Sequence, residues 1–153
     1  VLLDNSDPER EETLICQGCV LYKENKFEES KVKFEEAKAL CSSPSIDYNI
    51  AVCYYKLKQI SATNQYLSNI MEYAASVANS SSLYESCLIE AYNLRAAILY
   101  LISVEEARNT LNDMPPRDEE ELDSVTLHNL ALVNIDKDPD DSFKKMNFLL
   151  KVS

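Results

Sequence analysis

Glycine and tryptophan are almost missing from this sequence of 153 residues, which contains a single glycine, Gly18, and no tryptophan. Glycine-rich phosphate-binding loops and tight β-hairpins depend on positive backbone φ angles, which glycine adopts at little cost. A chain with so little glycine is therefore a poor candidate for a nucleotide-binding loop or a hairpin-rich β fold. Its composition favours helices instead.

Basic residues are scarce relative to acidic ones, because 15 Lys and Arg stand against 26 Asp and Glu, for a net charge of −11. Nucleic acids and anionic membrane surfaces need a basic binding surface, so we expect neither as a partner. No apolar run approaches the ~18 residues of a membrane-spanning helix, which predicts no direct membrane insertion. The start lacks the features of a signal peptide, and without an initial Met we expect a fragment of a longer chain.

The five cysteines do not form a pattern that indicates a disulfide framework or a metal site. They are Cys16, Cys19, Cys41, Cys53 and Cys87, and four of them sit in apolar helical patterns. An odd count of this kind favours buried, reduced thiols. The Cys16-x-x-Cys19 pair would need a second pair of ligands to bind zinc, and the sequence offers none, so we expect these two residues to pack or to line a groove.

Two acidic motifs have simple structural interpretations. Asp136-x-Asp138-x-Asp140 begins like a calcium-binding loop, but that loop requires Gly at its sixth position and an acid at its twelfth. Here Asp141 and Asn147 hold those positions, so we expect a capped helix start. The run of acids at 118–121 follows two prolines and is expected to be a solvated face, with contact to a basic partner as the alternative.

An internal repeat is the strongest signal in the sequence. Four similar segments can be aligned at residues 15–22, 48–55, 92–99 and 128–135. Three of them begin with an aromatic residue or His, then Asn, then an aliphatic residue. The fourth position of the segments holds Gly18, Ala51, Arg95 and Ala131, at spacings of 33, 44 and 36.

These spacings are close to the ~34-residue period of tetratricopeptide repeats, in which small residues let two helices approach closely. A helical hairpin cannot bury its apolar face alone, whereas stacked hairpins can. We therefore predict an all-α fold, a tetratricopeptide-type superhelix (solenoid) of about four hairpins. The expected parts are an acidic leader at 1–10, a hairpin at 11–43, a second at 44–82 with an extended second helix and a Ser-rich loop, a third at 83–116, and an acidic loop with a degenerate hairpin at 117–153.

In such solenoids the first helix of each hairpin lines the concave surface, which predicts a set of partner-binding residues. They are Tyr22, Tyr48, Asn49, Val52, Tyr55, Tyr92, Asn93, Ala96, Leu99, His128, Asn129 and Leu132. The three asparagines would form a ladder whose amides pair with the backbone of an extended peptide. The aromatic and aliphatic remainder suits a proline-rich ligand.

Two other functional classes find less support. Co-chaperone repeat domains, which bind acidic C-terminal peptides, hold the terminal carboxylate with several Lys, Arg and Asn residues, and Lys56 is the one clear cation expected in this groove. That adaptor remains the alternative function. An enzyme would need a catalytic arrangement, but His128 is the sole histidine and no recognisable motif surrounds it. We expect no catalytic residues, no metal and no cofactor.

One stretch is more specific than the repeat itself. Residues 112–129, which include Met114-Pro-Pro-Arg117, resemble a characteristic segment of the tetratricopeptide-repeat protein 30 family, with further matches at 18–24, 47–55, 90–98 and 148–150. The resemblance implies a central fragment of a core subunit of intraflagellar transport complex B. It implies a cilium and cytoplasm location, a tight superhelix around a proline-rich segment of another complex B subunit, and links to the ciliary kinesin-2 and to tubulin polyglutamylation. The segment 74–83 is shorter here than in that family.

Overall fold

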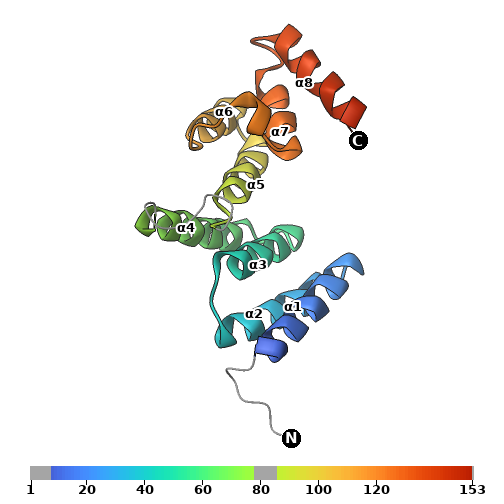
Figure 1. Ribbon diagram of the computed structural model, residues 1–153, viewed down its shortest axis with the longest axis vertical. Coiled ribbons are helices and arrows are strands. Elements are labelled where there is room, and N and C mark those ends of the chain that lie inside the picture. The colour runs from blue at the N-terminus through green and yellow to red at the C-terminus, as the bar shows by residue number, and fades with distance from the viewer. Residues whose placement is uncertain (1–7, 78–85, 153) are drawn as a thin grey trace, which may run out of the picture. The chain divides into compact units, whose positions relative to one another are not determined.

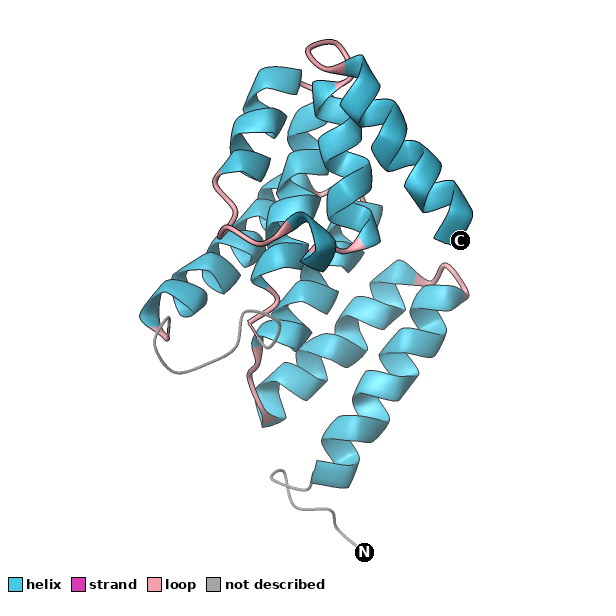
Figure 2. Ribbon diagram, turned by 45° about the horizontal axis from the view of Figure 1, so that its top comes forward, coloured by secondary structure: helices cyan, strands magenta, loops and turns pink. Residues whose placement is uncertain are grey.

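All regular structure in the described part of the chain is helical (Figure 2). The computed structural model describes residues 8–77 and 86–152. Residues 1–7 of the expected acidic leader and the Ser-rich part of the expected loop at 79–82 lie outside these ranges. The predicted all-α fold of helical hairpins is confirmed, because successive helices pack in pairs.

The helices belong to two compact units, residues 1–88 and 89–153. Unit 1 contains two hairpins, α1 (Pro8–Lys23) with α2 (Phe27–Leu40), and α3 (Pro44–Lys56) with α4 (Ile60–Ser76); the partners lie side by side in Figure 1. The elements of unit 2 are α5 (Leu88–Tyr100), α6 (Val104–Asn112), the 3-10 helix η1 (Glu119–Glu121), α7 (Ser124–Asn134) and α8 (Pro139–Val152). Helix α1 therefore already includes the last residues of the expected leader.

Side-chain caps fix several helix starts. The Ser43 hydroxyl accepts a hydrogen bond from the Ile46 N–H at 3.3 Å, and Pro44 occupies the first helical position of α3. Asp138 accepts one from the Asp141 N–H at 3.1 Å directly before α8. Such caps satisfy N–H groups that have no partner inside the helix. The acidic 136–140 motif is thus a capped helix start, as the sequence predicted.

Helices α1 and α3 end in the same turn, at positions one repeat apart. Asn25 and Lys58 both adopt left-handed backbone conformations, with φ angles of 63° and 64°. In each turn this residue donates its N–H to the carbonyl three residues back, and the next residue donates to the carbonyl five residues back, at 2.9–3.0 Å. This is the Schellman pattern that closes a helix C-terminus.

The core of unit 1 depends on the single glycine. The Ser30 hydroxyl donates a hydrogen bond of 2.7 Å to the Gly18 carbonyl, which joins α2 to the backbone of α1. A Cβ atom on Gly18 would lie only 2.7 Å from the Phe34 ring, which is 2% exposed. The absence of a side chain therefore allows the close approach of α1 and α2 that the repeat predicts for this position.

Unit 2 has its own core, formed by Ala96, Ala107, Leu111 and Val133 from α5, α6 and α7. Arg108 of α6 closes it, since its guanidinium donates to the Val133 carbonyl and to the Asn134 side chain. The same group pairs with Glu105 and with Asp136. Arg108 thus ties α6 to the C-terminal end of α7, where helix carbonyls lack partners within the helix.

Candidate functional site

Unit 1 holds an apolar pocket on the first helices of its two hairpins, which we call the α1–α3 pocket. Its volume is about 300 Å³, and its lining residues are Cys19, Tyr22, Lys23, Phe34, Tyr48, Asn49 and Val52. Four residues that the sequence placed in a partner-binding groove are among them: Tyr22, Tyr48, Asn49 and Val52. Most of the lining is aromatic or aliphatic, with one amide and one ammonium group at its border.

The wall of this pocket is held in place by aromatic packing. The Tyr22 ring meets the Phe27 ring edge to face, with centroids 5.2 Å apart. Burial raises the pKa of the Tyr22 phenol above its usual value, and the nearby Cys53 thiol raises it further. Tyr22 therefore stays protonated at neutral pH and can donate a hydrogen bond to a ligand carbonyl.

Unit 2 holds a second apolar pocket, the α5–α7 pocket. Its volume is about 200 Å³, and its lining residues are Ala96, Ala97, Tyr100, His128, Asn129, Leu132 and Val133. Four further predicted residues are present here: Ala96, His128, Asn129 and Leu132. The two pockets lie on equivalent helices, so each unit brings the first helices of neighbouring hairpins together around an apolar hollow.

Asn93 does not have the role that the sequence predicted for it. The residue is 5% exposed, its amide N–H donates to the Thr126 hydroxyl at 2.8 Å, and its amide oxygen accepts from the Asn129 side chain at 3.0 Å. Because both polar ends of Asn93 are used inside the protein, its amide is not available to a peptide. Of the three asparagines in the expected ladder, Asn49 and Asn129 line pockets, whereas Asn93 is buried and accepts a hydrogen bond from the Asn129 side chain.

This polar network continues to the segment after the two prolines. The Arg117 guanidinium contacts Asp123 at 3.2 Å and donates to the Thr126 hydroxyl at 3.3 Å. Thr126 in turn donates its hydroxyl to Asp123 at 2.6 Å and its N–H to the same carboxylate at 3.0 Å. Burial alone would raise the pKa of Asp123, but these hydrogen bonds from Thr126 and Arg117 outweigh it and lower the pKa.

Sequence reasoning missed Arg117 and Thr126 as parts of the site. The sequence did contain a signal, because Asp123 stands three residues before Thr126. An N-cap side chain accepts a hydrogen bond from the N–H of a residue at this spacing. The structure shows this cap at the start of α7. The Met114-Pro-Pro-Arg117 segment is therefore anchored to the helix that carries His128 and Asn129, and it fixes the orientation of the α5–α7 pocket wall.

The remaining predicted residues are not among the lining residues of either pocket. Leu99 packs against the core of unit 2. Tyr55 and Tyr92 are partly buried on α3 and α5 and line neither of the two pockets. Lys56, the expected cation of a carboxylate-binding groove, is exposed and also lies outside both linings. The cation that borders the α1–α3 pocket is Lys23 instead.

The cysteines differ from the expected set of buried thiols. Cys53 is buried, Cys87 is partly buried, and Cys16, Cys19 and Cys41 are exposed, and none of the five forms a disulfide. Burial raises the pKa of the Cys53 thiol despite its hydrogen bond to Ser30, so it is a poor nucleophile. The prediction failed because apolar neighbours in the sequence do not specify which face of α1 is covered. Cys19 nevertheless lines the α1–α3 pocket, as expected for a groove residue.

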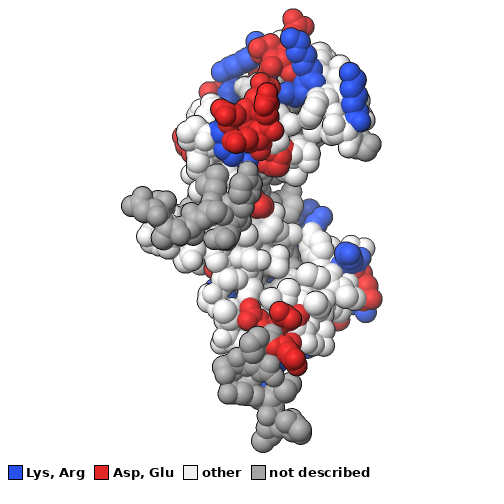
Figure 3. Space-filling view, in the orientation of Figure 1, with Lys and Arg blue, Asp and Glu red and all other residues white. Residues whose placement is uncertain are grey.

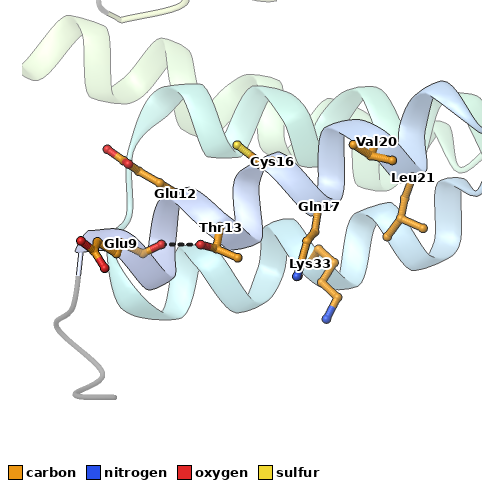
Figure 4. Close-up of a pocket in the computed structure, with 8 residues that line it drawn as sticks. All are labelled: Glu9, Glu12, Thr13, Cys16, Gln17, Val20, Leu21 and Lys33. Atoms are coloured by element: carbon orange, nitrogen blue, oxygen red, sulfur yellow. Dashed lines mark hydrogen bonds between the residues drawn. The ribbon is translucent and has the colours of Figure 1, made fainter. Parts of the chain in front are cut away.

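A wider and shallower hollow of about 810 Å³ lies on another face of the first hairpin (Figure 4). Its lining comes from α1, apart from Lys33 of α2: Glu9, Glu12, Thr13, Cys16, Gln17, Val20, Leu21 and Lys33. The one hydrogen bond drawn within it joins the Thr13 hydroxyl to the Glu9 carbonyl at 2.7 Å, inside α1. Cys16, which the sequence placed in packing or in a groove, lines this hollow, whereas none of the twelve predicted partner-binding residues does.

Charged side chains gather in unit 2 around η1. Figure 3 shows acidic and basic groups side by side over the α6–α8 end of this unit. Glu119 of η1 pairs with Lys145 of α8 at 3.5 Å, and Lys145 also pairs with Asp141. In residues 8–77 and 86–152 no three His, Cys, Asp or Glu side chains are arranged as metal ligands, and no helix there has the length and apolarity needed to cross a membrane.

Comparison with known proteins gives a consistent set of relatives, although no protein-family model matches the chain. The chain is 43% identical over 169 residues to intraflagellar transport protein 70A of Danio rerio, which covers 97% of this chain and 26% of that protein. The human 70A protein is 40% identical over 154 residues, and the match covers 88% of this chain and 23% of the human protein. The 70B protein of Rattus norvegicus is 41% identical over 154 residues, with the same coverage.

The match with the Danio rerio protein extends over more positions than this chain has residues, so that relative carries residues that this chain lacks. The chain spans 23–26% of the length of these relatives. The relatives agree with the intraflagellar transport resemblance of the 112–129 segment. Over almost its whole length, the chain is homologous to a stretch of the intraflagellar transport 70 proteins.

Proposed function

We propose that this chain is part of a non-enzymatic scaffold of intraflagellar transport complex B, which works in the cilium and the cytoplasm. In this proposal the α1–α3 pocket and the α5–α7 pocket each bind extended, proline-rich sequence of another complex B subunit. The observation that carries it is the convergence of eight predicted groove residues into two apolar pockets on the first helices of the hairpins. The homology to intraflagellar transport proteins supports the cellular process.

The chemistry of the pockets suits such a segment. Tyr22 and Tyr48 offer aromatic faces, and proline rings pack on such faces with little loss of entropy because the polyproline conformation is already extended. A proline-rich chain has few N–H groups but many free carbonyls. The Tyr22 hydroxyl and the Asn49 amide, both at the α1–α3 pocket, can donate to those carbonyls.

The links to kinesin-2 and to tubulin polyglutamylation belong to this proposal at the level of the assembled complex. Neither requires a catalytic group in this chain. A scaffold that holds one complex B subunit along its pockets can influence motor loading or tubulin modification by keeping the complex intact. Loss of the pockets would therefore affect these processes indirectly, through loss of the bound subunit.

Co-purification with single charge insertions tests the proposal. The chain would be immobilised, incubated with extract of ciliated cells and washed at high salt, and the retained proteins identified by mass spectrometry. Val52→Glu and Leu132→Glu each place a carboxylate in a pocket. Val32→Glu is the matched control, because Val32 is exposed on α2 and lines neither pocket.

We expect the wild type and Val32→Glu to retain complex B subunits, and Val52→Glu or Leu132→Glu to lose them while circular dichroism shows intact helices. An apolar contact should persist at high salt, whereas one between exposed charges should weaken. If all four proteins retained the complex B subunits equally, the claim that the pockets bind the partner would be wrong. Retention of chaperones through their acidic C-termini would favour the adaptor function instead.

A further inference from the structure

The turn between α5 and α6 presents two adjacent apolar side chains to solvent. Leu101 is 81% exposed and Ile102 is 75% exposed, so most of their apolar surface lies in water. The corresponding turns of the other three hairpins expose polar residues, with Asn25 between α1 and α2, Lys58 between α3 and α4, and Lys137 between α7 and α8. The turn between α7 and α8 also exposes a single aliphatic residue, Ile135, which is 37% exposed. The apolar pair is thus a special feature of one hairpin and not of the repeat.

Hydrogen bonds hold this turn in a defined conformation. The Leu99 carbonyl accepts the N–H groups of both Ile102 and Ser103, at 2.8 and 2.7 Å. The Ser103 hydroxyl then caps α6 by accepting the N–H of Glu106 at 3.3 Å. The two apolar side chains therefore project from a fixed backbone, and a partner would not have to order the turn when it binds.

The local sequence explains why this turn closes differently. Ile102 lies seven residues after Arg95, as Asn25 lies seven residues after Gly18 and Lys58 seven after Ala51. Asn25 and Lys58 adopt positive φ angles, which a β-branched residue such as Ile avoids. The turn at Ile102 therefore does not adopt the Schellman conformation found at Asn25 and Lys58. An exposed aliphatic residue stands at this position, where the other two turns have a polar one.

Acidic side chains follow the apolar pair at the start of α6. The first turn of α6, directly after it, carries Glu105 and Glu106, and the Glu105 side chain is 60% exposed. Asp136, whose side chain is 67% exposed, approaches the same helix through Arg108. Arg108 is itself buried, and Lys137 balances only part of the negative charge, through Glu105 at 3.6 Å.

We propose that Leu101 and Ile102 form a docking knob for a basic amphipathic helix of a partner protein. The apolar pair would insert between the aliphatic residues of such a helix, and its Lys or Arg residues would lie against Glu105, Glu106 and Asp136. Exposed aliphatic residues beside an excess of acidic side chains match a helix with an apolar stripe and basic flanks. The knob uses different residues from the two pockets, so this contact is separate from the proposed peptide binding.

A designed peptide provides the probe. It would be a fluorescein-labelled helix of Leu and Lys with Leu at positions i, i+3, i+4 and i+7. Its counterpart would have Glu in place of every Lys. Fluorescence anisotropy would measure binding to the wild-type chain, to Leu101→Ser/Ile102→Ser, to Glu106→Gln, and to Val20→Ser/Val32→Ser. The last variant is the control, because it removes two exposed aliphatic residues elsewhere in the chain.

The Lys peptide should bind the wild type and the control equally, and its affinity for Leu101→Ser/Ile102→Ser should fall by about tenfold or more, since two aliphatic side chains lose their burial. Glu106→Gln should reduce affinity less and weaken its dependence on salt. Equal binding to the wild type and the serine variant, or equal binding of the Glu peptide, would overturn the proposal. So would dimerisation in sedimentation velocity that the serine variant abolishes, because the occupant would then be a second copy of the chain.

Discussion

Substitution of Gly18 by Ala tests the packing that joins the first two helices. In an unconstrained helix interior this change stabilises by about 1 kcal/mol, because Gly has greater backbone freedom in the unfolded chain. Gly18 has no positive φ angle, so the backbone itself would accept Ala. The obstacle is space, because the new Cβ would lie 2.7, 2.8 and 3.0 Å from three atoms of the Phe34 ring.

The Phe34 ring has little room to move. It is 2% exposed and belongs to a buried cluster that includes Leu14, Ala37 and Ile50. Ordinary carbon contacts are ~3.5–4.0 Å, and overpacking of a core by one methyl costs roughly 1–3 kcal/mol. After the gain in helix propensity is subtracted, we expect Gly18→Ala to destabilise the protein by about 1 kcal/mol.

A smaller partner should reverse the sign of the effect. Phe34→Leu removes ring atoms that the new methyl meets, so Gly18→Ala in that background should stabilise by up to ~1 kcal/mol. Urea unfolding followed by circular dichroism gives both free energies of unfolding, and hydrogen exchange shows whether α1 and α2 carry the change. If Gly18→Ala stabilises the wild type and the Phe34→Leu variant equally, the close approach of the two helices has been misjudged.

Three further perturbations probe other parts of the fold. Arg108→Ala should destabilise by about 2–3 kcal/mol, because the Val133 carbonyl and Asn134 lose a charged donor; a change in urea midpoint within error would show that solvent replaces it. Lys58→Gly should stabilise the protein by about 1 kcal/mol, since Lys58 has a φ angle of 64°. Gln65→Gly, inside α4, should destabilise the protein by about the same amount. A melting temperature that is higher for Gln65→Gly than for Lys58→Gly would refute this reasoning. The Asp123 pKa is lowered on folding, so its contribution is complete above the unfolded pKa of about 3.9 and is lost as pH falls through the lower folded value. Asp123→Asn should therefore be less stable than wild type at neutral pH and lose that deficit in acid, and a deficit independent of pH would contradict the assignment.

Much of the fold followed from the sequence because the repeat encodes local contacts. Gly18 and Ala51 lie one repeat apart and both are buried, and at Gly18 the helices α1 and α2 approach closely. The prolines at 44 and 139 stand at the first positions of helices, where a missing N–H costs little. Positions on the first helices of the hairpins, such as Tyr48 and Leu132, could be assigned to pockets because helical periodicity specifies which residues share a face.

The pattern could not distinguish Asn93 from Asn49 and Asn129. All three follow an aromatic residue or His and precede an aliphatic one, yet Asn93 is buried and donates its amide N–H to Thr126 of the next hairpin. That contact joins residues far apart in the sequence, and no local signal specifies it. The exposure of Cys16 and Cys41 has a similar origin, since helical periodicity does not reveal which faces the neighbouring elements leave uncovered.

Site-specific photocrosslinking tests the proposed pockets most directly. Benzoylphenylalanine would replace Asn49, Asn129 or, as a control, the exposed Gln65 of α4, and each protein would be irradiated with ciliated-cell extract. We predict that positions 49 and 129 crosslink to a proline-rich stretch of a complex B subunit and that position 65 does not. Crosslinks from position 65 alone, with the same subunit still co-purifying, would contradict the claim that the first helices of the hairpins hold the partner.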